Sequence, residues 1–389
     1  MKDHFSYQNC SKLHDYVKYS PKTDFTAKSA QFCATILLSF LNYPGKKRTR
    51  QLGSIIIFLQ KNIETKMNMH PCNHTVFGNL EQTLAKLMHA DPNFVMGKVM
   101  SLSLQLLGEN ARQKPKLLYD VNNFEDKAQK SNISSWEKMH LKALRSLVKE
   151  DLWSCTRLYD DILFEYPLDS FALTMSYLTG LYTAQMDLLR NIPARVVTEY
   201  SKSDRFYGTV NGKLCFGFEE CNQFDEAERA GAIALDHTPN DIWAIHSIAH
   251  IKEETQRPRD GLKLLSDTES QWQQRASLVT HVWWHKALFH FQLGEFEEAI
   301  TSFDDVILPN CQKEPGPFPL SDVTSLLMRL QCEPKPIGID LKDRWREVGK
   351  MYQNIVEDTA TMYIFYDFHA LLGCLYGDER YDNLGWQVF

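Results

Sequence analysis

Residues 223–240 read Gln-Phe-Asp-Glu-Ala-Glu-Arg-Ala-Gly-Ala-Ile-Ala-Leu-Asp-His-Thr-Pro-Asn. The small residues Ala227 and Ala234 fall on one face of a helix, where they would let a second helix approach closely. Pro239 cannot extend that helix, so it marks the end. The stretch therefore predicts a helix that packs tightly against a neighbour and then stops.

The same pattern returns downstream. Residues 293–303 read Leu-Gly-Glu-Phe-Glu-Glu-Ala-Ile-Thr-Ser-Phe, which again gives a turn, an aromatic residue and a small residue, Ala299. The interval from Ala227 to Ala299 fits two periods of ~34 residues with a slight excess, and Gly261 occupies the matching small position between them. The pattern resembles the second helices of tetratricopeptide repeats (TPR), whose helix pairs stack on one another. We therefore expect an all-α, TPR-like α-solenoid of stacked helical hairpins.

The repeat array is expected to cover residues 79–389, because apolar residues recur at helical spacing from residue 79 onward. The Pro-rich stretch 315–319 is expected to form a loop or a local boundary before two or three terminal helices. Further helix pairs are predicted at 79–108, at 135–144 with 152–159, and at 171–190.

Composition excludes several classes of protein. The chain has 389 residues, of which 43% are hydrophobic and 24% charged, so a disordered or fibrous chain is not expected. Its net charge is -6, whereas proteins that bind nucleic-acid phosphates usually carry a cluster of basic residues. No nucleic-acid partner is therefore expected.

The sequence also bears on the cellular compartment. No apolar run approaches the ~18 to 20 residues of a membrane-spanning helix, and the opening residues 1–6 lack an apolar signal core. The nine cysteines are odd in number and form no C-x-x-C motif, which suits free thiols in a reducing compartment. We therefore expect a cytoplasmic protein with no membrane partner, and neither zinc fingers nor a disulfide framework.

Four motifs carry a more specific resemblance. They are Ala-Asp-Pro-Asn-Phe-Val-Met-Gly at 90–97, Asp-Ile-Trp-Ala-Ile-His-Ser-Ile-Ala-His at 241–250, His-Val-Trp-Trp-His-Lys-Ala-Leu at 281–288, and Asp-Phe-His at 367–369. Together they resemble the tetratricopeptide repeat protein 38 family, which includes bacterial proteins.

The resemblance is interrupted in three places. The N-terminal segment 1–78 contains a stretch, 22–74, that has no counterpart in the family pattern and is expected to be an insertion. The family pattern also continues for more helices beyond Phe389, which implies a shortened C-terminus and an exposed apolar end. Where the family has a His-Asp step, this chain has Met175-Ser176.

Two pairs of histidines are candidate metal ligands. His246 and His250 are four residues apart, as are His281 and His285, so each pair lies on one side of its helix. The resemblance implies that both helices are first helices of neighbouring repeats, which line the concave wall of a solenoid. Four imidazoles are therefore expected to share one groove.

Carboxylates accompany several of these histidines. Glu137 precedes His140 by three residues, Glu253 follows His250 by three, and Asp367 precedes His369 by two. Imidazole and carboxylate ligands without thiolate suit iron, manganese or zinc. The candidate metal ligands are His140, His246, His250, His281, His285 and His369, and the candidate groups that line the groove or orient the ligands are Glu137, Glu253, Asp367, Trp243 and Trp284.

A plainer interpretation stands beside each of these assignments. A histidine in a groove more often hydrogen-bonds a neighbour than a metal, and aromatic residues such as Trp243 and Trp284 more often pack in the core than clamp a ligand. Two functions follow. The first is a scaffold whose concave groove binds a protein or peptide without chemistry, and the second is a metal-dependent enzyme, an oxygenase or a hydrolase.

Overall fold

The computed structural model describes His89, Asp91 and residues 94–108, 115–130, 132–273, 278–333, 338–355 and 364–377. All regular structure in these ranges is helical and none of it is strand, which confirms the all-α expectation. The expected N-terminal segment 1–78 and its insertion 22–74 lie outside the described residues. The chain divides into two compact units, Met1–Asp204 and Arg205–Phe389, and each is described by itself.

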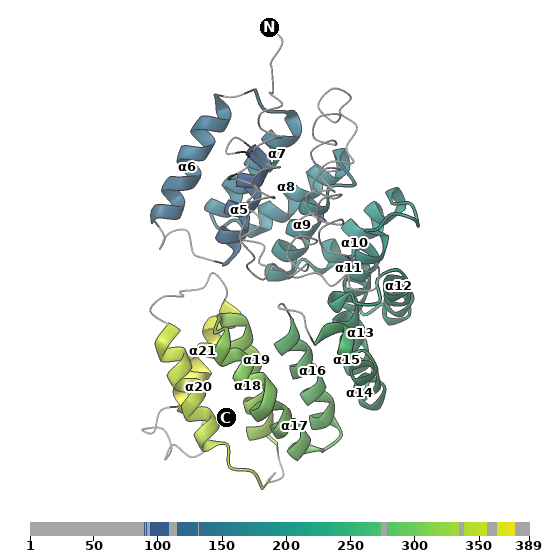
Figure 1. The fold of residues 1–389 in the computed structure, drawn as a ribbon, viewed down its shortest axis with the longest axis vertical. Coiled ribbons are helices and arrows are strands. Elements are labelled where there is room, and N and C mark those ends of the chain that lie inside the picture. Colours follow the sequence, from purple (N-terminus) through teal and green to yellow (C-terminus); the bar gives the residue numbers. More distant parts are fainter. Residues whose placement is uncertain are drawn as a thin grey trace, which may run out of the picture. The chain divides into compact units, whose positions relative to one another are not determined.

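The first unit contains consecutive helices that pack in sequence order (Figure 1). Helix α5 packs on α6 and α7, α7 on α8, α8 on α9, and α9 on α10. The pairs expected at 135–159 and 171–190 correspond to α7/α8 and α9/α10, whereas only α5 of the pair expected at 79–108 lies largely within the described residues. The helices are α5 (Val95–Gly108), α6 (Pro115–Gln129), α7 (Ser135–Val148), α8 (Leu152–Glu165), α9 (Ser170–Tyr182), α10 (Met186–Val196) and the short 3-10 helix η2 (Val197–Glu199).

The second unit repeats the hairpin arrangement. Helix α11 pairs with α12, α13 with α14, and α16 with α17, while the first helices contact one another in the order α11, α13, α16 and α19. The helices are α11 (Tyr207–Glu219), α12 (Phe224–His237), α13 (Ile242–Glu254), α14 (Pro258–Asp267), α15 (Glu269–Trp272), α16 (Val279–Gln292), α17 (Phe296–Ser302), the π-helical turn η3 (Phe303–Ile307), α18 (Leu308–Lys313), α19 (Pro317–Gln331), α20 (Lys342–Ile355) and α21 (Ile364–Gly377). No described helix combines the length and the apolar character that a membrane span requires.

Five hairpins of the described residues close through the same turn. One residue between the paired helices has a positive φ of 53 to 75°, and the N–H group of the next residue donates to the carbonyl five positions earlier at 2.8 to 3.1 Å. This is the Schellman motif, which satisfies the last carbonyls of a helix. The positive-φ residues are Glu150, Ala184, Asn222, Gln256 and Gly294.

Small residues allow helices of neighbouring hairpins to pack at close range. Ala227 and Ala234 are fully buried on α12, as the pattern at 223–240 predicted. A Cβ atom added at Gly231 would lie 2.8 Å from Ile248, and one added at Gly261 would lie 2.3 Å from the ring of Phe289. Such distances leave no room for a side chain, so the small positions of the repeat are required by packing.

The Pro-rich stretch 315–319 forms the expected boundary before three terminal helices, but most of it is helix and not loop. Helix α19 starts at Pro317 and includes Pro319 in its first turn, after Gly316 in an extended conformation. Proline is tolerated there because the first N–H groups of a helix have no partner within it. The stretch therefore marks the start of a helix that packs between α16 and α21.

Candidate metal site

The two histidine pairs converge within the second unit. His246 and His250 lie on α13, and His281 and His285 lie on α16, the adjacent first helix. The Nε2 atoms are 2.9 Å apart in the first pair and 3.2 Å apart in the second. One ligand atom from each of the four rings lies within 4.8 Å of every other.

Carboxylates lie beside the Nδ1 atoms of three of the four rings and hydrogen-bond two of them. Nδ1 of His285 donates to Oε2 of Glu253 at 3.1 Å, and Nδ1 of His281 donates to Oδ1 of Asp322 at 2.9 Å. Nδ1 of His250 lies 3.6 Å from Oε1 of Glu219. Metal-bound imidazoles commonly have such a carboxylate partner, because it orients the ring and makes the metal-facing nitrogen more basic.

This anchoring decides which atoms face inward. A carboxylate only accepts hydrogen bonds, so Nδ1 of His281 and of His285 carries the hydrogen and, in the neutral rings, each Nε2 presents a lone pair. The two lone pairs then face each other at 3.2 Å. A cation between them satisfies both nitrogens at once.

The cation is not expected to be a proton on His246 or His285, because burial disfavours the charged form of both rings. His246 is 4% exposed and His285 is 1% exposed. Burial, followed by the charges of the neighbouring histidines, holds the pKa of His246 and of His285 well below the usual value. For His250 burial acts in the same direction, but the carboxylates of Glu219, Glu253 and Glu220 outweigh it and raise the pKa.

The spacing of the rings fits a single ion after a small adjustment. Imidazole nitrogens bound to zinc lie about 2.0–2.1 Å from the ion, so tetrahedral ligands are roughly 3.3 Å apart. The contacts of 2.9 and 3.2 Å lie near that value. Because no two of the four ligand atoms are more than 4.8 Å apart, tetrahedral binding would require the two pairs to approach by at most about 1.5 Å.

Two tryptophan rings and the guanidinium group of Arg329 lie around the histidine cluster. Trp284 stacks on His281 with ring centroids 5.1 Å apart, and Trp243 meets His246 edge to face at 5.9 Å. Both tryptophans are half-buried and pack on imidazoles, so they line the site as well as filling space. The guanidinium of Arg329 lies 5.3 Å from the ring of Trp284.

His140 and Glu137 belong to the first unit and have structural partners there. Nε2 of His140 donates to Oδ2 of Asp169 at 2.8 Å, and the same carboxylate accepts from Trp136. Oε2 of Glu137 accepts the backbone N–H of Ser134 in the capping box of α7, so it does not orient His140 as expected. Neither residue is in a converging ligand group among the described residues.

His369 and Asp367 lie on α21 in the second unit, also outside the converging groups of the described part of the chain. Nδ1 of His369 donates to the carbonyl of Phe365 at 2.8 Å, and Asp367 is exposed. Burial lowers the pKa of His369 although that hydrogen bond and the charge of Asp322 oppose the shift. Of the six predicted histidine ligands, the structure thus brings four together at one point.

Sequence reasoning missed the partners that come from distant helices. Glu219 ends α11 and Asp322 lies in the first turns of α19, so no local spacing connects either to the histidines. The repeat pattern could have indicated these partners, because the first helices of successive repeats are neighbours. Helices α11, α13, α16 and α19, which carry Glu219, the histidines and Asp322, do contact one another in that order.

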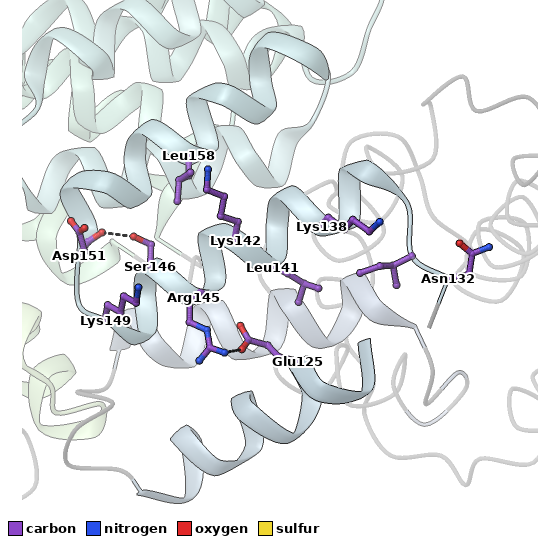
Figure 2. Close-up of a pocket in the computed structure, with 11 residues that line it drawn as sticks. Glu125, Asn132, Lys138, Leu141, Lys142, Arg145, Ser146, Lys149, Asp151 and Leu158 are labelled. Atoms are coloured by element: carbon purple, nitrogen blue, oxygen red, sulfur yellow. Dashed lines mark hydrogen bonds and ion pairs between the residues drawn. The ribbon is translucent and has the colours of Figure 1, made fainter. Parts of the chain in front are cut away.

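The first unit contains a separate, basic pocket of about 580 Å³. Figure 2 shows Lys138 and Lys142, one turn apart on α7, and Lys149, the residue directly after the helix, while Arg145 pairs with Glu125. The three lysines are exposed and form no ion pair with a described residue. The rest of the lining consists of the apolar residues Ile133, Leu141 and Leu158, the polar residues Asn132 and Ser146, and the carboxylate of Asp151.

The fold and the site together define a helical-repeat protein with a histidine cluster on its first helices. No protein-family model matches the sequence.

Proposed function

We propose that the protein is a metal-dependent helical-repeat protein that holds a divalent transition-metal ion between α13 and α16. The observation that carries the proposal is the convergence of four imidazoles whose inward Nε2 atoms lie 2.9 and 3.2 Å apart within each pair. The Nε2 lone pairs of His281 and His285 face each other at 3.2 Å in a largely buried site, which is costly without a cation. The fourfold ligand set is His246, His250, His281 and His285.

Imidazole ligands narrow the choice of metal. Nitrogen donors of this kind suit zinc, iron, copper or nickel, whereas manganese prefers carboxylate and water ligands. Zinc and iron therefore remain the best candidates from the three metals expected on sequence grounds. When bound, such an ion supplies a Lewis acid for hydrolysis or a centre for oxygen activation.

The chain's own residues would then set the properties of the site. Glu253 and Asp322 fix the orientation of the imidazoles, while Trp243 and Trp284 limit the access of water. This arrangement supports an enzyme of the oxygenase or hydrolase class. We also propose that the protein is a member of the tetratricopeptide repeat protein 38 family. The stacked hairpins and the positions of the four histidines support this proposal.

The test is the metal content of the purified protein by elemental analysis. We expect a stoichiometric transition metal in the wild type and its loss in the double variant His246→Ala/His285→Ala. The control is His237→Ala, an exposed histidine on α12 whose Nδ1 bonds to the carbonyl of Ile233. A wild-type protein that is folded and binds no zinc or iron after reloading would exclude the proposal.

The basic pocket favours a second candidate function, a scaffold that binds an acidic protein segment. Three exposed lysines at helical spacing, without ion-pair partners among the described residues, offer such a segment complementary charge around an apolar floor. We expect a peptide rich in Glu and Asp to bind less tightly as salt increases. Binding should be lost in Lys138→Glu/Lys142→Glu/Lys149→Glu and kept in Lys202→Glu, an exposed lysine of the second half of the first unit.

A further inference from the structure

Nδ1 of His250 lies farther from its carboxylate than Nδ1 of His281 and of His285. Nδ1 of His281 and of His285 meets its carboxylate at hydrogen-bonding distance, 2.9 and 3.1 Å, whereas Nδ1 of His250 lies 3.6 Å from Oε1 of Glu219. A separation of 3.6 Å exceeds that of a good N–H···O hydrogen bond. It is close to the spacing of a nitrogen and an oxygen that bind the same ion, roughly 3 to 4 Å for bond lengths of 2.0–2.2 Å.

The carboxylate that faces this gap is incompletely bonded. Glu219 is 6% exposed, and its Oε2 atom is buried without a hydrogen-bond partner among the described residues. The side chain of Glu220 adds a second carboxylate, and one ligand atom from each of Glu219, Glu220 and His250 lies within 4.8 Å of the others. Two adjacent carboxylates, one buried and one half-buried, repel each other unless a cation lies between them.

The charges around the cluster also call for more than one cation. Four carboxylates surround the histidines, and the guanidinium of Arg329 acts on the site from α19. One divalent ion together with Arg329 leaves a net negative charge, while two divalent ions together with Arg329 compensate all four carboxylates and a deprotonated imidazole. The four carboxylates are Glu219, Glu220, Glu253 and Asp322.

We propose that Glu219, Glu220 and Nδ1 of His250 hold a second divalent cation, so that the imidazole ring of His250 bridges two metal ions. Nε2 of His250 faces the four-histidine site and Nδ1 faces Glu219, with a carboxylate oxygen of Glu220 within 4.8 Å of a ligand atom of each. Binding of both ions displaces the last ring proton of His250 to solvent and leaves an imidazolate. The inference rests on the proposed four-histidine site and adds to it a carboxylate-rich second site, which makes the centre dinuclear.

The test uses Cu²⁺ as a probe, added to the full-length, metal-free protein and followed by elemental analysis and electron paramagnetic resonance. We expect two copper ions per chain and a spectrum in which the second equivalent couples to the first through the bridging ring. Glu219→Gln and Glu220→Gln should each bind one ion with an isolated signal. The matched control Glu254→Gln removes an exposed carboxylate near the site and should still bind two.

The outcomes separate this inference from the proposal on which it depends. One copper ion in the wild type, two uncoupled ions, or two ions retained in both glutamine variants would overturn the dinuclear site and leave the four-histidine site standing. A folded wild type that binds no ion would overturn both. Far-UV circular dichroism of each variant establishes that the helices are intact.

Discussion

Glu253 on α13 accepts a hydrogen bond at 3.1 Å from Nδ1 of His285 on α16, so a carboxylate of one hairpin orients an imidazole of the next. The contact joins two first helices that pack directly against each other. The position of the ring thus depends on the stacking of the repeats. A metal bound by both helices should in turn stabilise that stacking.

The variant Glu253→Gln should weaken metal binding without removing a ligand. An amide keeps the shape of the side chain but lacks the negative charge that makes the ring more basic, so we expect the affinity for Zn²⁺ to fall by about 10- to 100-fold. Competition with a chromophoric chelator measures the change. Glu254→Gln, one residue along, should alter the affinity far less, and equal effects in the two variants would show that Glu253 contributes only net charge.

Asp169 should be a structural residue of the first unit. Its carboxylate binds His140 and Trp136 and also accepts the N–H of Ala172 at the start of α9. Asp169→Ala removes a helix cap and leaves buried polar groups without a partner, so we expect a loss of about 3 to 5 kcal/mol in the free energy of unfolding.

Chemical denaturation of Asp169→Ala measures this loss, with the exposed Asp161→Ala as control. The Zn²⁺ content of the folded variant should equal that of the wild type. A fall in metal content without a fall in stability would instead give His140 and Asp169 a part in metal binding.

Gly261 should be intolerant of even one methyl group. A Cβ atom there would lie 2.3 Å from the ring of Phe289, which is fully buried and cannot move aside. Gly261→Ala should therefore cost about 1 to 3 kcal/mol despite the better helix propensity of alanine. In Gly180→Ala the new atom would meet the end of the Leu189 side chain at 3.2 Å, so thermal denaturation should show a much smaller change.

Lys213 on α11 should make stability depend on pH in the alkaline range. Burial lowers its pKa from 10.5 to about 8, against the attraction of Asp241. Between these two values the unfolded chain binds more protons than the folded chain, so the free energy of unfolding gains a positive contribution as pH rises from about 8 to 10.5. The contribution reaches at most about 3 kcal/mol, and solvent contact of the amine reduces it.

The measurement compares urea unfolding of the wild type and Lys213→Met at pH 7.5 and pH 10, in the presence of a chelator. Cysteines and tyrosines also titrate in this range, so the difference between the two proteins is the quantity of interest. We expect the wild type to gain stability relative to Lys213→Met as pH rises. The same difference at both pH values, or parallel behaviour of Lys202→Met and Lys213→Met, would contradict a buried, destabilised ammonium group.

The repeat pattern predicted much of the fold, because it depends on local rules. The spacing of Ala227, Ala234 and Gly261 indicated the close helix faces, and each of these residues lies at a tight packing position. The turns were harder to recognise: of the five positive-φ residues that close the hairpins, only Gly294 is a glycine. The Pro-rich stretch 315–319 marks the expected boundary before three terminal helices, but the expectation of a loop was wrong from Pro317 onward, because proline also fits the first turn of a helix.

The amino-acid sequence by itself determined which histidines share a helix face, since residues four apart are neighbours on any helix. It also determined the two-helix unit and its approximate period. Only the tertiary structure decided that the pairs at 246/250 and 281/285 meet, that His140 bonds to Asp169 instead, and that Asp322 and Glu219 stand behind the imidazoles. The physical reason is that these contacts join different helices, and their distances depend on how closely the small residues of each hairpin allow the helices to stack.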